Sequence, residues 1–295
     1  MKWLPLLLRS AVVAIFVTGL FATSASGANT RHNPQRVWDL RQYGYSNEAR
    51  DYSTVGFLSE NLLLVAINQA PDGSPHPLFE ETPDAILVLF DVSQEKPRKI
   101  AHMPISESVV SDAVRPALGG NFLVQSLSEV KLCSADLQCD RAYATKGPLW
   151  LSADRAKVVV GGNLMTKRVV LDSRTLAPIP GEYPARVVTD WQQSGRRDGS
   201  FVDSISSVDR TRLMRVETQQ TRWSKITNPL GGLGSRPYDR RIIRVYDTQT
   251  GRELLTLRWD PRHDWGGILR KPALSANGHR VALLRRGLVE VFEVP

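Results

Sequence analysis

The residues best suited to bind or transform a ligand gather in one stretch, residues 259–267, which reads WDPRHDWGG. It combines two tryptophans, two aspartates and a histidine. On a long loop carried by a rigid scaffold, such a mixture can line a ligand site. The alternative is that the stretch connects two structural units and its tryptophans cover a core. Both interpretations stay open at this point.

Two further tryptophans lie outside the segments that resemble strands. Aromatic residues on exposed loops are typical anchors for protein partners, although tryptophan at a junction between structural units is equally ordinary. With the stretch above, they complete a set of six candidate binding residues: Trp191, Trp223, Trp259, His263, Asp264 and Trp265.

The sequence contains none of the familiar catalytic patterns. No Gly-x-Ser-x-Gly occurs, no Cys-x-x-Cys-His occurs to attach a haem, and the glycines within 231–234 follow no apolar strand as a dinucleotide loop would. A glycosidase needs two carboxylates about 5–10 Å apart. Asp190, Asp203 and Asp264 are available, but spacing along the chain cannot show that they converge. We therefore assign no catalytic residue and expect no cofactor.

The first 28 residues have the pattern of a secretory signal. Lys2 and Arg9 precede an uncharged apolar run over residues 11–22, and small residues follow at 23–28. Cleavage after Gly27 or after Ala28 fits equally, and an uncleaved N-terminal anchor is the alternative. We expect an exported protein, periplasmic or extracellular, in which residues 29–35 are a short linker. No later apolar run is long enough to span a membrane.

Metal binding is not expected from the histidines or cysteines. No two of the five histidines lie within five positions of each other, so they provide no ligand pair for a transition metal. Cys133 and Cys139 are the only cysteines. In an exported chain such a pair favours a disulfide across a hairpin, and two free thiols are the alternative.

The net charge of +8 comes from scattered basic residues. They include arginine pairs at 196–197, 240–241 and 285–286. Many of the basic residues fall where strands expose one face, which favours a solvated surface over a nucleic-acid site. Weak attraction to an anionic envelope surface is the less favoured interpretation. We expect a monomer.

An internal repeat organises the rest of the chain. Its first block is a turn containing Asn or Asp followed by an apolar strand, as tight turns between antiparallel strands require. The second block is an alternating strand that ends at a polar turn, mostly with Asp. Five turns of the first kind are centred on Asn61, Asn121, Asp154, Asp209 and Asn277.

Each second block predicts a third strand, and four of them lead to a fourth. The third strands are expected at 86–91, 130–133, 168–172, 242–247 and 289–293, and the fourth at 98–101, 141–144, 176–179 and 253–257. We interpret Asp91, Asp172 and Asp247, at strand ends, as acceptors for local backbone N–H groups. Four strands per repeat predict an all-β propeller of four-stranded antiparallel blades.

The last repeat stops after its third strand, whereas residues 35–40, just after the signal, form an unassigned strand-like segment. We predict that this segment completes the last blade and closes the ring, which removes exposed sheet edges. The domain then spans residues 36–295. Five blades are expected, with six or seven as the alternative, because a degenerate blade could lie at 186–189. Long insertions are expected at 69–84, 182–200, 217–239 and 258–271.

These repeats resemble the WD-repeat-like and YVTN-like β-propeller superfamily, especially its exported bacterial members. The resemblance rests on the turn-and-strand copies at 151–161 and 274–284 and on VYDTQTG at 245–251. The Gly-His and Trp-Asp signatures of strict WD repeats do not recur, since Trp38-Asp39 is a single instance. Our leading hypothesis is a propeller without enzymatic activity that binds a protein, peptide or envelope ligand on one face of the ring, through the long insertions. The alternatives are a glycosidase-like or lactonase-like propeller enzyme with carboxylates facing the channel, and a redox-partner propeller.

Overall fold

The computed structural model separates Met1–Arg31 from a second unit, His32–Pro295. All described residues belong to the second unit: 33–45, 54–68, 85–105, 109–126, 128–145, 149–161, 167–184, 187, 189, 191–195, 201–219, 240–259, 272–285 and 287–295. No helix among them is long and apolar enough to cross a membrane.

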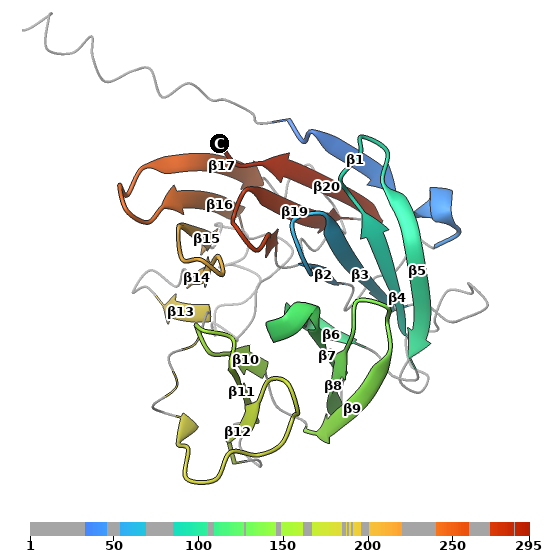
Figure 1. The fold of residues 1–295 in the computed structure, drawn as a ribbon. Coiled ribbons are helices and arrows are strands. Elements are labelled where there is room, and N and C mark those ends of the chain that lie inside the picture. Colours follow the sequence, from blue (N-terminus) through green and yellow to red (C-terminus); the bar gives the residue numbers. More distant parts are fainter. Residues whose placement is uncertain are drawn as a thin grey trace, which may run out of the picture. The chain divides into compact units, whose positions relative to one another are not determined.

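The second unit is built of five antiparallel sheets (Figure 1). In chain order, the first complete sheet contains β2 (Thr54–Phe57), β3 (Leu62–Asn68), β4 (Ala85–Asp91) and β5 (Arg98–Ile105). The next contains β6 (Val109–Pro116), β7 (Phe122–Ser126), β8 (Glu129–Cys133) and β9 (Cys139–Ala144). We call them sheets I and II.

Sheet III contains β10 (Leu149–Leu151), β11 (Lys157–Val160) and β12 (Val169–Asp172). Sheet IV contains β13 (Trp191–Gly195), β14 (Phe201–Ser206), β15 (Arg212–Gln219), β16 (Arg240–Asp247) and β17 (Glu253–Trp259). Sheet V contains β18 (Ala273–Leu274), β19 (Arg280–Arg285), β20 (Leu288–Glu293) and β1 (Arg36–Asp39). Two short 3-10 helices lie at Leu40–Tyr43 and Leu118–Gly120.

The apolar core lies between the faces of neighbouring sheets. One cluster joins sheets V and I through residues such as Trp38 and Phe90, and another joins I and II through Leu87 and Phe122. A third joins II and III, and a fourth joins IV and V. Each sheet is too small to bury its apolar faces alone, so stacking against its neighbours stabilises it. The predicted all-β propeller with five blades is confirmed.

The predicted closing strand is also confirmed. Strand β1 pairs antiparallel with β20, with Arg36 opposite Val291 and Asp39 opposite Leu288. The backbone N–H of Leu40 continues the pairing by donating to the carbonyl of Gly287. The first described strand of the chain therefore supplies the outer strand of the last blade.

All five predicted turns connect consecutive antiparallel strands: the first and second strands of sheets I, II, III and V, and β14 and β15 of sheet IV. Three of the turns share one hydrogen-bond pattern. A serine hydroxyl accepts from the backbone N–H five residues later: Ser152 from Lys157, Ser207 from Arg212 and Ser275 from Arg280. The Asp or Asn two residues after each serine accepts another backbone N–H of the same turn. The residue after it has positive φ in each case: Arg155, Arg210 and Gly278.

The aspartates that end the third strands play the predicted role. Asp91 accepts from the N–H of Ser93, Asp172 from Arg174 and Thr175, and Asp247 from Gln249 and Thr250. Such bonds to the backbone satisfy donors of the turn and define where the strand ends.

The turn aspartates make folding sensitive to acid. The Ser152 hydroxyl, then the Ala156 N–H, lower the pKa of Asp154 from its ordinary 3.8. Burial raises the pKa of Asp209, but bonds from Ser207 and Thr211 outweigh it and the net shift is also downward. A lowered folded-state pKa means that the stabilisation is complete above the unfolded-state pKa and is lost as pH falls through the folded-state pKa.

We therefore expect the free energy of unfolding to fall below about pH 4. Asp154→Ala should lower the free energy of unfolding at pH 7 by about 0.5–1.5 kcal/mol per lost hydrogen bond. The further decrease of that free energy between pH 7 and pH 3 should be smaller in the variant than in the wild type. Urea unfolding at pH 7, 5 and 3 measures both effects. Asp136→Ala, at an exposed turn position, is the control, and an equal acid dependence in Asp154→Ala and the wild type would contradict the account.

Three details of the repeat differ from expectation. The fourth strand predicted at 176–179 is reduced to a single bridge, Leu171 to Pro178, because proline has no N–H to donate and Leu176 has φ of 55°. Sheet IV has an extra strand, β13, formed by residues that we expected to belong to the insertion at 182–200. The insertions predicted from 217 and 258 also begin later, since Glu217–Gln219 belong to β15 and Arg258–Trp259 to β17.

Candidate functional site

The two ends of the sheets differ in character. At one end, turns of different blades contact each other. The N–H of Asn277 donates to Glu60 Oε1 at 2.6 Å, Arg280 Nη1 donates to the Glu60 carbonyl at 2.8 Å, and the N–H of Val208 donates to the Ala276 carbonyl at 2.8 Å. These bonds place the first turns of sheets I, IV and V side by side, and we call this end the turn face.

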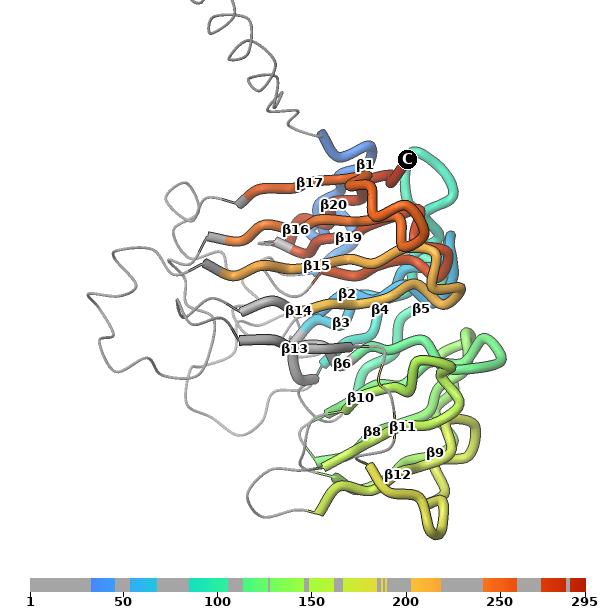
Figure 2. The backbone as a smooth tube through the Cα atoms, turned by 90° about the vertical axis from the view of Figure 1, so that its left-hand side faces the viewer, coloured from blue at the N-terminus to red at the C-terminus, as the bar shows by residue number. Residues whose placement is uncertain are grey.

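The opposite end of the same sheets carries the long connecting segments. Asn68 pairs with Ala85 in sheet I, so residues 69–84 leave and return there. Gln219 pairs with Arg240 in sheet IV, so residues 220–239 do the same, and Trp259, where the segment to sheet V begins, is at that end too. Figure 2 shows β14 to β17 side by side, with the hairpins of β14–β15 and β16–β17 at the same end. We call the end bearing these segments the segment face.

The six candidate binding residues are only partly within the described chain. Trp259 pairs with Arg241 near the segment face. Trp191 pairs with Ile205, which lies near the turn face, so the structure places these two tryptophans toward opposite ends of sheet IV. Trp223, His263, Asp264 and Trp265 lie outside the described residues, and their role stays a prediction.

A small cavity lies at the centre of the five sheets. It is lined by β2, the end of β6, β14 and β18, together with Arg155 from the turn after β10, so every blade contributes. Its volume is about 40 Å³, which is room for roughly three water molecules at 10–15 Å³ each. Pockets that hold drug-sized ligands measure about 300–1,000 Å³.

Among the described residues, the charged residues that line this cavity are basic. They are Arg115, on β6, and Arg155, and no aspartate, glutamate or histidine is among the described lining residues. The Arg115 Nε is buried and has no hydrogen-bond partner among the described residues. Arg155 is 8% exposed, and its Nη1 donates to the Pro116 carbonyl at 3.4 Å. Sequence reasoning missed both arginines because they come from different blades.

The carboxylates considered for a glycosidase do not form a pair in the described chain. Asp203 lies on β14 and has an interaction partner, but it is not a lining residue of the cavity. Asp190 and Asp264 lie outside the described residues. Within the described ranges, no group of three His, Cys, Asp or Glu residues could hold a metal ion.

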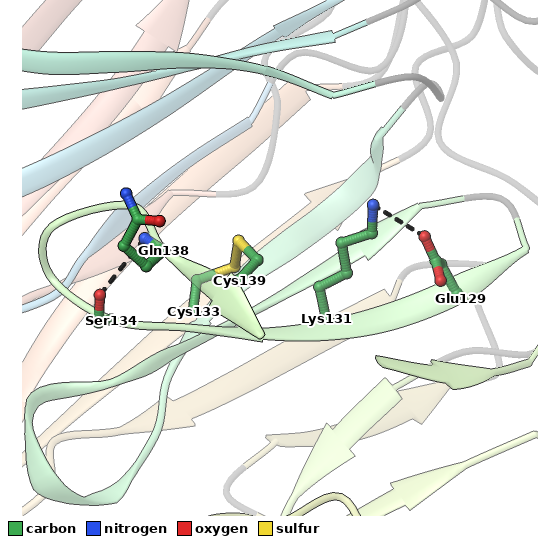
Figure 3. Close-up of a disulfide and its surroundings, with 6 residues drawn as sticks. All are labelled: Glu129, Lys131, Cys133, Ser134, Gln138 and Cys139. Carbon is green, nitrogen blue, oxygen red and sulfur yellow. Dashed lines mark hydrogen bonds and ion pairs between the residues drawn. A yellow bond between two sulfur atoms is a disulfide. The ribbon is translucent and has the colours of Figure 1, made fainter. Parts of the chain in front are cut away.

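The predicted disulfide is present. Cys133, the last residue of β8, is bonded to Cys139, the first residue of β9, with the Cα atoms 4.0 Å apart (Figure 3). The N–H of Gln138 donates to Ser134 Oγ at 3.3 Å within the same hairpin, which also lies on the turn side of its sheet. The bond therefore joins two neighbouring strands of sheet II.

Comparison with known proteins gives no family. No protein-family model matches the chain, and no curated protein matches it. Among solved structures, the WD40 domain of Neurospora crassa Pan2 is similar at 10% identity, covering 90% of this chain and 97% of that one, with a TM-score of 0.48.

Two other solved structures are similar to a lesser degree. Kluyveromyces lactis Hsv2 is 13% identical over 83% of this chain and 75% of that one, with a TM-score of 0.34. The β-propeller domain of Myceliophteria thermophila Cps50 (Swd1) is 9% identical over 82% of this chain and 83% of that one, with a TM-score of 0.37. These likenesses are too distant to say anything about function.

Proposed function

We propose that this protein is an exported, non-enzymatic β-propeller that binds a protein, peptide or envelope ligand on its segment face. The observation that carries the proposal is that short turns lie at one end of the sheets and long connecting segments at the other. The turn face is made of short turns whose polar groups bond to each other. The long segments, with the candidate residues Trp223, His263, Asp264 and Trp265, all start and finish at the other end.

The central cavity favours binding over the enzymatic alternative. A glycosidase-like or lactonase-like propeller needs carboxylates facing the channel, whereas the charged residues in the described part of this lining are arginines. Its volume of about 40 Å³ is also too small for a sugar ring. We therefore place ligand recognition on the segment face.

Export is supported by the signal-like pattern of residues 1–28 and by the disulfide, because disulfides persist mainly in oxidising compartments. A fusion of residues 1–35 to a reporter that is active only outside the cytoplasm tests this part. An active reporter is expected, and activity that survives replacement of residues 11–22 by polar residues would contradict it.

The binding test uses purified protein carrying a photo-crosslinking residue in place of Trp223, exposed to envelope extract. Partners captured in this way are then titrated against Trp223→Ala, Trp265→Ala and, as the control on the turn face, Val208→Ala, whose side chain is exposed. Loss of an aromatic anchor is expected to weaken binding at least tenfold. Wild-type affinity in both tryptophan variants, or loss only in Val208→Ala, would overturn the assignment to the segment face.

A further inference from the structure

We propose that the central cavity is a binding site for a small carboxylate, held between Arg115 and Arg155. This site is separate from the proposed function. Four of the lining residues are each the last residue of a strand before a turn: Phe57, Pro116, Ser206 and Leu274. The cavity therefore lies toward the turn face, away from the segment face.

The charge of the cavity points to an anion. Two arginines are among the described lining residues, and none of those residues is acidic, so the lining favours a negatively charged ligand over a positively charged one. A buried donor without a partner costs free energy, and the Arg115 Nε is such a donor among the described residues. An anionic oxygen on Arg115 would satisfy it.

The shape and polarity of the cavity favour a carboxylate over a phosphate. Arginine binds the two oxygens of a carboxylate through parallel N–H groups in one plane. The rest of the wall is largely apolar, with Val55, Val114 and Ile205. Those side chains suit the alkyl part of a carboxylic acid but would leave the further oxygens of a phosphate without donors. Space for roughly three water molecules fits an acid of two or three carbons.

The test is a titration of the full chain, labelled at its valine and isoleucine methyl groups, followed by NMR. Acetate and propionate are compared with acetamide, which has the shape of acetate without its charge, and with inorganic phosphate. Saturable shifts at the methyl groups of Val55, Val114 and Ile205 are expected with the two carboxylates and not with acetamide. Equal shifts with acetamide, tighter binding of phosphate, or an absence of saturation with either carboxylate would overturn the proposal.

Two variants test the role of the arginines. Arg115→Gln keeps a polar side chain without the charge and should weaken carboxylate binding at least tenfold, whereas Arg115→Lys should retain part of it. Arg98→Gln is the control, because Arg98 is 76% exposed at its side chain on the outer strand of sheet I. Thermal melting shows that each variant is folded. Unchanged affinity in folded Arg115→Gln, or an equal loss in Arg98→Gln, would remove the arginine from the site.

Discussion

Replacing Trp38 by alanine should lower the free energy of unfolding by about 3–5 kcal/mol, as large-to-small changes of buried aromatic residues do. Trp38 lies on the closing strand β1 and is 4% exposed. Its ring packs against Phe90 of sheet I, with the ring centroids 5.7 Å apart. The side chain therefore ties the closing strand both to its own sheet and to the next blade. Equilibrium unfolding in urea measures the loss.

Trp38→Phe is the matched control. The Trp38 Nε1 is buried without a hydrogen-bond partner in the described structure, so phenylalanine removes an unsatisfied donor and keeps an aromatic ring beside Phe90. We expect a much smaller loss than with alanine. Val37→Ala, on the same strand with a side chain that is 51% exposed, should change stability by less than about 0.5 kcal/mol. Similar losses in all three variants would contradict a role for the buried ring in closing the propeller.

Gly56→Ala should destabilise the protein by about 1–3 kcal/mol through overpacking. Gly56 lies on β2, and a Cβ at this position would be 2.7 Å from Val114 Cγ1 and 3.2 Å from the Val114 carbonyl oxygen. Valine is branched at Cβ and stiff, so its side chain cannot easily move aside. The inner strands of sheets I and II therefore approach each other more closely than any residue with a side chain allows.

A double-mutant cycle separates this contact from other effects. Val114→Ala alone should cost about 2 kcal/mol for two lost methyl groups. In the double variant the new methyl of residue 56 occupies space that the valine side chain vacates. The loss of unfolding free energy in the double variant should therefore be about 1 kcal/mol smaller than the sum of the losses in the two single variants. Urea unfolding of the four proteins gives the coupling. Strict additivity would show that the close approach is not the cause of the destabilisation.

The sequence was sufficient to predict those parts of the fold that are encoded locally. Each turn has Asp or Asn at a fixed distance from a serine or a small residue. The hydrogen bonds that shape the turn itself join neighbouring residues, as at Ser207 and Asp209. The closing strand was predictable for a different reason. The last repeat lacked its fourth strand, and the strand-like segment at 35–40 belonged to no repeat. The disulfide followed from there being only two cysteines.

Features that depend on contacts between blades were not predictable from the sequence. Arg115 and Arg155 belong to different repeats, and nothing in their spacing shows that both line one cavity. Strand β13 was missed because its sequence, WQQSG, lacks the apolar alternation by which other strands were recognised, and it is held by pairing with β14. The shortening of the fourth strand in sheet III follows from Pro178 together with the positive φ of Leu176.

The pairing of β1 with β20 also governs the order in which the molecule can be assembled. Glu293 donates its backbone N–H to Gln35 Oε1, 258 positions earlier in the chain. Contacts so distant in sequence form late, since the entropy of closing the loop must be overcome first. In a polypeptide that emerges from a ribosome or a translocation channel, β1 therefore cannot pair until β20 has also emerged. Because these two segments end up adjacent, joining them covalently and opening the chain elsewhere would preserve every sheet while changing which blade folds last.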